Sequence, residues 1–278
     1  MGPMDRRERS GFRQPLALIL LILSCVGLLA LPFAASRLLR IMMHPAAPSA
    51  STVAPRGPQP TPPIARRFEW PLQPQDSYGP YVQGLNGSRA IDTSFGAQNP
   101  ALGNRSNCFQ DRGGNPVPFS QLYHAGVDLF SLDRTGVFLW GSAARNPVRA
   151  VADGVVVSAL DAGTEGQILM TEHSLEDQTT VYAVYWHVDQ LRVASGQPVE
   201  CGQIIALVHD QGLNSHLHWE MRTFPDGSQL FPSGTAGARG TCNGHAAGVA
   251  YTWDDVQEKA RPEFYGYLDP LLFVASPH

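Results

Sequence analysis

The stretch SHLHWEMR, residues 215–222, places two histidines one residue apart in a run that is typical of a β-strand. Because successive side chains of a strand point to opposite faces, His216, His218 and Glu220 are predicted to share one face, with the apolar residues on the other. Imidazoles that face a cleft or solvent suit metal binding or proton transfer better than core packing. Surface histidine pairs are common, so this pattern indicates a site only if further ligands join it.

A second group of potential ligands lies in YHAGVDLF, residues 123–130, where His124 and Asp128 flank Gly126. On a fully extended strand these two residues would lie ~13 Å apart, too far to share an ion. A glycine permits a sharp bend or bulge that brings both side chains to one point. With one histidine of the 216/218 pair they would form a three-ligand set with an open position, as in a catalytic zinc site. The alternative is an ordinary turn that contains an aspartate.

The other histidines carry less information. His187 ends the apolar run YAVYWHV, where a core histidine with satisfied hydrogen bonds is the default interpretation. His173 ends another strand-like run and is predicted to be structural. No role is assigned to the remaining histidines, which are His44, His209, His245 and His278.

The composition favours strands and turns over long helices. The 278 residues include 27 glycines and 23 prolines, and only 16% are charged. The net charge of −4 and the isoelectric point near 6.1 give no reason to expect nucleic acid as a partner.

Residues 15–35 form an apolar run without a charge, long enough to cross a bilayer as a helix. Four arginines precede this run and two follow it closely, which predicts a cytoplasmic N-terminus and an extracytoplasmic remainder. A cleaved signal peptide is the alternative, but the run is long for one and Phe33-Ala34-Ala35 is a poor cleavage site. A lipoprotein anchor through Cys25 fits less well, because this cysteine lies in the middle of the run.

Four parts of the chain are predicted: a basic cytoplasmic tail (1–14), a transmembrane anchor (15–36), a proline-rich extracellular linker (37–67) and one domain (68–278) with its core at 121–223. The linker contains seven prolines within residues 44–65. Such a composition favours extended conformations and does not form a packed core.

The domain from Phe68 onward is predicted to be β-rich. Runs of β-branched residues alternate with turn residues at hairpin spacing, which predicts strands over 148–160, 166–173, 180–188, 201–210 and 216–222. TWDDVQEKA, residues 252–260, is predicted to form a short capped helix. Residues 99–119 and 224–250 are predicted to be long loops.

Three cysteines would face an oxidising compartment if this topology holds. Cys108 and Cys242 both lie in the long loops, so a disulfide between them is the favoured pairing. Cys201 is predicted to be a small buried residue at the start of a strand. The odd count leaves one thiol free, and the sequence does not fix the pairing.

Five motifs occur in the order and spacing of the lysostaphin/LytM-type zinc endopeptidases, and they are HAGVDLF, VRAVADGVVVSA, YWHVDQL, GQPVECGQIIALV and HLHWEMR. The chain resembles this family most strongly over 121–223. SFGAQNP (94–100) is similar to its opening strand, and YLDPLLFV (267–274) to its closing segment. The resemblance implies a mainly β fold: an antiparallel two-sheet LytM-like domain (duplicated hybrid motif) with a zinc-floored groove.

Carried over residue by residue, the resemblance makes His124, Asp128 and His218 the ligands of a Zn2+ ion. It makes His216 and His187 the catalytic pair beside the metal, with His216 as the general base for a zinc-activated water. One histidine of the opening pair would then bind the ion and the other would handle the proton. The sequence leaves the division of labour between the catalytic pair open.

The function implied by this resemblance is that of a membrane-anchored zinc endopeptidase. Its partners would be the peptide stems or cross-bridges of bacterial peptidoglycan, and the membrane through the N-terminal helix. The alternative is a non-catalytic or autoinhibited LytM-like factor that binds the cell wall or regulates other wall hydrolases. All five chemical positions are filled, which favours catalysis. The two long loops are expected to wall the groove, whereas the scissile bond and the oligomeric state are not specified.

Overall fold

The computed structural model describes residues 63–83, 91–99, 109, 111, 113–225, 250–254, 256 and 259–277. The predicted cytoplasmic tail, the predicted membrane anchor and most of the predicted linker lie outside these residues. So do Cys25, Cys108 and Cys242, and with them the expected disulfide. Within the described part of the chain, no helix has the length and apolar character needed to cross a membrane.

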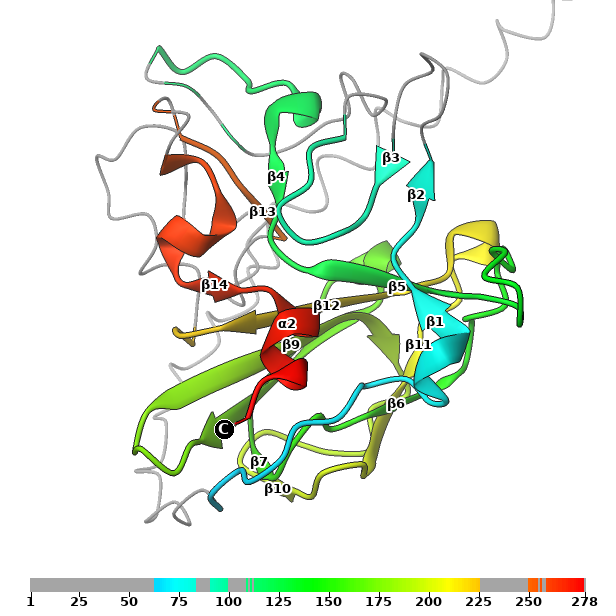
Figure 1. Cartoon of the computed structure of the whole chain (residues 1–278), viewed down its shortest axis with the longest axis vertical. Helices are drawn as coiled ribbons and strands as arrows, with labels where there is room; N and C mark the ends of the chain where they lie inside the picture. Colours follow the sequence, from blue (N-terminus) through cyan, green and yellow to red (C-terminus); the bar gives the residue numbers. More distant parts are fainter. Residues whose placement is uncertain are drawn as a thin grey trace, which may run out of the picture. The chain divides into compact units, whose positions relative to one another are not determined.

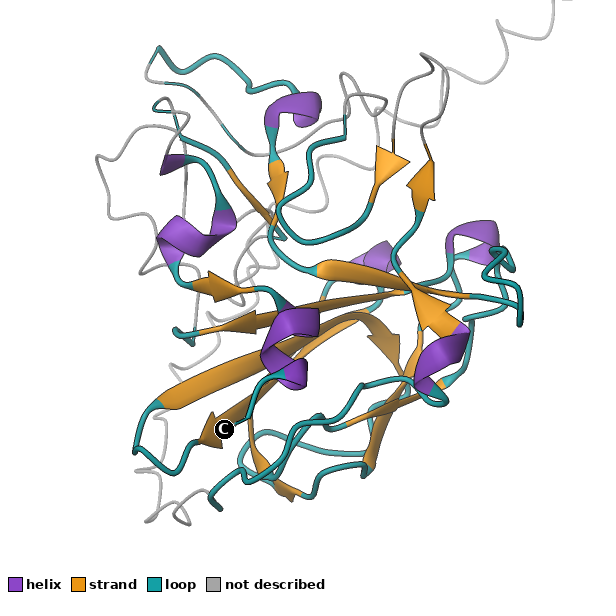
Figure 2. Cartoon of the chain, in the orientation of Figure 1, coloured by secondary structure: helices purple, strands orange, loops and turns teal. Residues whose placement is uncertain are grey.

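Strands dominate the described residues, and the helices are short (Figure 2). The strands are β1 (Tyr78–Gly79), β2 (Val82–Gln83), β3 (Ile91–Asp92), β4 (Tyr123–His124), β5 (Val127–Ser131), β6 (Pro147–Arg149), β7 (Gly154–Asp161), β8 (Gln167–Ser174), β9 (Thr180–Asp189), β10 (Pro198–Val199), β11 (Ile204–Val208), β12 (Leu217–Arg222), β13 (Tyr251–Thr252) and β14 (Tyr267–Leu268). The helical elements are α2 (Pro270–Ala275) and the 3-10 turns η2 (Gln75–Ser77), η4 (Phe119–Gln121), η5 (Gly163–Glu165), η6 (Gly212–Asn214) and η9 (Pro262–Tyr265).

Most strands belong to one ten-stranded antiparallel sheet, in the order β1-β5-β12-β9-β8-β7-β10 (Figure 1). Strand β14 joins it through β12, while β11 joins it through β9 and carries β6. Two further pairs, β13 with β4 and β2 with β3, stand apart from it. The expected mainly β, antiparallel fold is therefore confirmed. The expected two sheets are instead one branched sheet with two small ribbons, because β9 pairs with both β11 and β12 along the same edge.

The centre of the sheet is built from the residue types that favour strands. Strands β7, β8 and β9 are rich in Val, Ile, Thr, Tyr and Trp, whose side chains pack well on a pleated surface. Strand β12 adds Leu217, Trp219 and Met221 to the main core, next to Tyr185 of β9. Burial of each such side chain stabilises the fold by about 1.5–3 kcal/mol. The predicted apolar face of this strand is confirmed.

Two predicted elements differ from the structure. The run 148–160 is divided into β6 and β7, because Ala150, Val151 and Ala152 enter the core without forming a strand. The helix predicted over 252–260 is wrong in its first part, since Thr252 belongs to β13 and Trp253 is not helical. Trp253 is buried in a second apolar cluster, so long-range packing overrides the local helical pattern.

The segments that resemble the first and last parts of the family's domain are only partly strands. Residues 94–96 make a turn rather than a strand, and only Gln98 forms an isolated bridge to Tyr123. The closing segment contains β14 and α2. Asp269 caps α2 by accepting hydrogen bonds from the backbone of Leu271 and Leu272, and Pro270 occupies the first turn. This capping signal was present in the sequence and was missed.

Three further residues refine the predictions. Ala65, placed in the linker, is fully buried and its N–H donates to the Ser174 carbonyl, so core packing begins before Phe68. Cys201 lies half-buried in a turn, not at the start of a strand. His173 is fully buried between Thr171 and the Asp153 carbonyl, which fits a structural histidine.

Candidate metal centre

The strand is interrupted between His124 and Asp128, and this interruption brings the two side chains together. Strand β4 ends at His124, β5 begins at Val127, and the two residues between them form a bend. Gly126 is required by the close approach of β12, because a Cβ there would lie 2.5 Å from the Trp219 carbonyl oxygen and 3.0 Å from His218 Cε1. The predicted bend at this glycine is confirmed.

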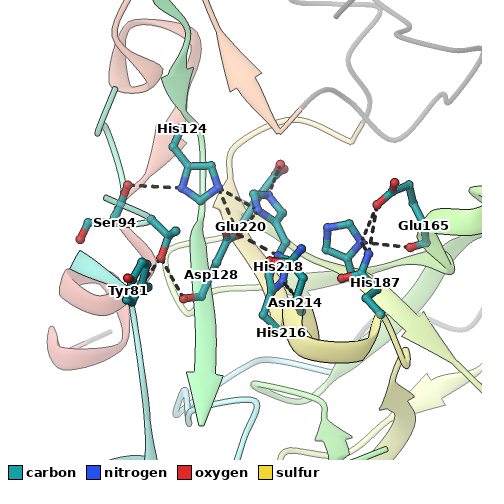
Figure 3. Close-up of polar contacts among 12 residues, drawn as sticks. Tyr81, Ser94, His124, Asp128, Glu165, His187, Asn214, His216, His218 and Glu220 are labelled. Carbon is teal, nitrogen blue, oxygen red and sulfur yellow. Dashed lines mark hydrogen bonds and ion pairs between the residues drawn. The ribbon is translucent and has the colours of Figure 1, made fainter. Parts of the chain in front are cut away.

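The third ligand candidate comes from β12, where His218 lies directly opposite Asp128 in the pairing with β5. Asp128 Oδ1 lies 3.2 Å from His124 Nε2 and 2.8 Å from His218 Nδ1, and the two nitrogens are 3.0 Å apart (Figure 3). Ligand atoms at about 2.0–2.1 Å from a tetrahedral zinc ion are about 3.3 Å from one another. A slight widening of this triangle therefore accommodates zinc, and the three side chains form a candidate metal site.

The second nitrogen of each ring supports this arrangement. His124 Nδ1 lies 3.3 Å from the Ser94 carbonyl oxygen, and His218 Nε2 lies 3.0 Å from Glu220 Oε1. Because these partners accept hydrogen bonds, each histidine places its proton there and turns a lone pair toward Asp128. Two lone pairs and a carboxylate oxygen then converge on one point, and such a donor set requires a cation.

The electrostatics of the metal-free site agree with this requirement. Burial disfavours the charge on Asp128, yet His124 and His216 lower the pKa of this carboxyl well below its ordinary value. Burial also disfavours charge on His218, but its hydrogen bonds to Asp128 and Glu220 raise its pKa to about 9. Without a metal, a proton on His218 thus supplies positive charge beside the Asp128 carboxylate.

His216 stands immediately before β12, beside this site. Its Nδ1 donates to the Asn214 carbonyl oxygen at 2.6 Å, so Nε2 carries the lone pair and faces Asp128 Oδ2 at 3.7 Å. The ring stacks on Phe130, with centroids 4.7 Å apart. Burial lowers the pKa of His216 below its ordinary value. The imidazole is therefore neutral at neutral pH and able to accept a proton.

His187 occupies the branch point of the sheet. Strand β9 pairs with β12 as far as Trp186 and with β11 from Val188, and His187 between them has a left-handed φ of 59°. Its ring centroid lies 4.7 Å from that of His216, and its Nδ1 lies 3.0 Å from the Glu165 carbonyl oxygen. Burial, and then His216, lower the pKa of His187 well below its ordinary value. The structure thus places His187 beside His216 instead of within the apolar core.

The site is more buried than the strand pattern predicts. His218 is only 1% exposed and His216 6%, although both were expected to face a cleft or solvent. The ring of Tyr251 in β13 lies 5.2 Å from that of His124, and Trp186 packs edge-on against His218. These covering residues come from segments distant in sequence, which strand alternation does not reveal.

Several contacts of the site were missed by sequence reasoning. Glu220 was placed on the correct face but given no role, and its position two residues after His218 was the available signal. The backbone carbonyl group of Ser94 contacts Nδ1 of His124, and that of Glu165 contacts Nδ1 of His187. Backbone groups occur in every residue, so the sequence held no signal for them.

Residues 124–232 match the family model for peptidase family M23. The family indicated by the motifs is thereby confirmed for this segment, which contains all five predicted site residues. No curated protein matches the chain significantly.

Solved structures of low identity resemble the chain. The catalytic domain of the antimicrobial peptidase lysostaphin from Staphylococcus simulans is 18% identical, over 63% of this chain and 90% of that one, with a TM-score of 0.30. A zinc-containing peptidase from Vibrio cholerae is 23% identical, over 51% and 43%, with a TM-score of 0.28. The chain spans about half (49%) of an M23 peptidase structure from Pseudomonas aeruginosa, at 17% identity over 60% of this chain and a TM-score of 0.32.

Proposed function

We propose that this chain is a zinc endopeptidase that hydrolyses the peptide cross-links of bacterial peptidoglycan. One observation carries the proposal: His124, Asp128 and His218 converge on one point beside a neutral His216, within the segment that matches a peptidase family. The substrate class follows from the resemblance of the five motifs to lysostaphin/LytM-type enzymes.

His124, Asp128 and His218 would hold the ion through Nε2, Oδ1 and Nδ1. Two nitrogens and one oxygen are donors that suit zinc, and three protein ligands leave one position open, as in catalytic sites. Zinc supplies Lewis acidity to a carbonyl oxygen and lowers the pKa of water to about 7.

His216 is the general base of the proposed reaction. Its Nε2 accepts a proton from the attacking water and later returns it to the leaving amine. The Asn214 carbonyl fixes the tautomer and the stack on Phe130 restrains the ring, so both contacts prepare Nε2 for this exchange. We assign His187 to the same proton transfer, because its ring lies beside that of His216, with centroids 4.7 Å apart.

We also propose that the chain is anchored in the membrane by residues 15–36, with the peptidase domain outside the cytoplasm. The uncharged apolar run and the excess of arginines before it support this topology. A substrate groove above the ion, walled by residues 99–119 and 224–250, belongs to the same proposal; most of both loops lie outside the described residues. Protease treatment of intact cells and of opened membranes would test the topology: cleavage of the domain only in opened membranes would contradict it.

The activity is tested by incubating the full chain, kept in solution with mild detergent, with purified peptidoglycan. New amino groups are expected to appear, and mass spectrometry of the fragments identifies the bond. Their release should vanish in a chelated sample and in His216→Ala, and should persist in the control His44→Ala, which alters the linker. No release from a wild-type chain that holds one zinc ion would contradict catalysis and favour the non-catalytic factor.

A further inference from the structure

We infer that Glu220, held in place by Arg222, is a positioning residue that fixes His218 as a metal ligand through Nδ1. This inference rests on the proposed zinc site and adds two residues to it. Both follow His218 on β12 at intervals of two, so the pleat of the strand places all three in one row.

The first contact in this row sets the tautomer of His218. Glu220 Oε1 lies 3.0 Å from His218 Nε2, and both side chains are only 2% exposed. A carboxylate can only accept here, so the ring proton stays on Nε2 and the lone pair on Nδ1 points to Asp128 and His124. With the proton on the other nitrogen, His218 would offer no lone pair to the ion.

The second contact places a guanidinium beside the other oxygen of Glu220. Its other oxygen, Oε2, forms an ion pair with Arg222 Nη1 at 3.4 Å. Arg222 is fully buried, and it is itself fixed by Met170 Sδ at 3.1 Å and by the ring of Phe224, which lies 5.0 Å from its guanidinium carbon. An isolated carboxylate at this depth would be strongly destabilising, and the guanidinium offsets that cost.

Packing restrains the glutamate from the opposite side. A Cβ on Gly126 would lie 3.0 Å from Glu220 Cγ, so the bend that positions His124 and Asp128 also closes over this side chain. The carboxylate has little freedom to leave His218. The three predicted ligands thus lie in one connected unit that consists of β4, the bend at Gly126, β5 and β12.

The competing explanation is that Glu220 and Arg222 form an ion pair that only stabilises β12. Removing one partner alone would leave the other charge buried and could unfold the chain. We therefore choose two double variants of the full chain. Glu220→Met/Arg222→Met removes the acceptor and both charges, whereas Glu220→Gln/Arg222→Met removes both charges and keeps an oxygen acceptor. Glu172→Gln, a half-buried glutamate on β8, is the control for the loss of a carboxylate.

Zinc affinity, measured by competition with a chromophoric chelator, is the first readout. Glu220→Met/Arg222→Met should bind zinc about 10- to 100-fold more weakly than the wild type, in line with other residues that orient ligands. Glu220→Gln/Arg222→Met should recover most of this loss, and Glu172→Gln should bind like the wild type. Urea unfolding of the metal-free variants establishes that each is folded.

The second readout is the NMR signal of the His218 Nε2 proton in the zinc-loaded chain. It should be protected from exchange in the wild type and in Glu220→Gln/Arg222→Met, and exchange-broadened when the acceptor is absent. Equal zinc affinity and equal protection in both double variants would overturn the inference while leaving the zinc site intact. A wild-type chain that binds no zinc would overturn the proposed function together with this inference.

Discussion

Replacement of Gly126 by alanine should damage the metal site more than its single methyl group suggests. The added Cβ would lie 2.5 Å from the Trp219 carbonyl oxygen, whereas real Cβ contacts are not shorter than 3.0 Å. The bend and β12 must therefore separate by at least 0.5 Å. The obstacle is backbone, so rotation of a side chain cannot relieve it.

This separation acts directly on the three ligand candidates, because His124 and Asp128 lie on one side of the contact and His218 on the other. Metal–ligand distances tolerate only about 0.2 Å. We expect zinc affinity to fall at least tenfold, which corresponds to about 1.4 kcal/mol. Overpacking should in addition lower the free energy of unfolding of the metal-free chain by about 1–3 kcal/mol.

Chelator competition and urea unfolding measure these two quantities. The matched control is Gly79→Ala, whose Cβ would meet only the Leu132 Cδ1 methyl at 3.1 Å, a side-chain atom that can move. The control should bind zinc like the wild type. If Gly126→Ala also bound zinc like the wild type, the close approach of the bend to β12 would not be what sets the ligand geometry.

Three further predictions concern stability. Burial lowers the pKa of His173 to about 4 in the folded chain, whereas the unfolded residue titrates near 6.5. About 3 kcal/mol of stability that is present above pH 6.5 should therefore be lost as the pH falls to 4. His173→Gln should remove this part of the pH dependence in urea titrations, and an unchanged curve would refute the prediction. Because His187 has a left-handed φ, His187→Gly should be about 1 kcal/mol more stable than His187→Ala. At Tyr182 on the same strand, which has no left-handed φ, the alanine variant should instead be more stable than the glycine variant. If glycine were the more stable substitution at both positions, the strain argument would be contradicted. Chelation should lower the melting temperature of the wild type, and about 4 kcal/mol of stability should be lost if zinc was present at 1,000 times its Kd. The melting temperature of Asp128→Asn should change little on chelation. Equal changes of the two melting temperatures in calorimetry would count against Asp128 as a ligand.

Local chemistry made much of the site predictable. Alternation along SHLHWEMR assigned Trp219 to the core and His218 to the other face, because the pleat is a property of each strand by itself. The glycine between His124 and Asp128 likewise signalled the bend that joins them. The β-rich character of the domain followed from composition and from the spacing of turn residues.

Tertiary structure decided the rest, because it depends on pairings between distant segments. His187 looked like a core histidine until the branching of β9 between β11 and β12 placed it beside His216. The segment at Thr252 looked helical until pairing with β4 made it a strand.

The sequence by itself thus determined which residue types are available and which strand faces carry them. The structure decided that His124 and His218, 94 residues apart, turn their lone pairs to one carboxylate in a buried site. Sheet register and the carbonyl groups opposite each ring produce this convergence, and neither is encoded in the identity of a single residue.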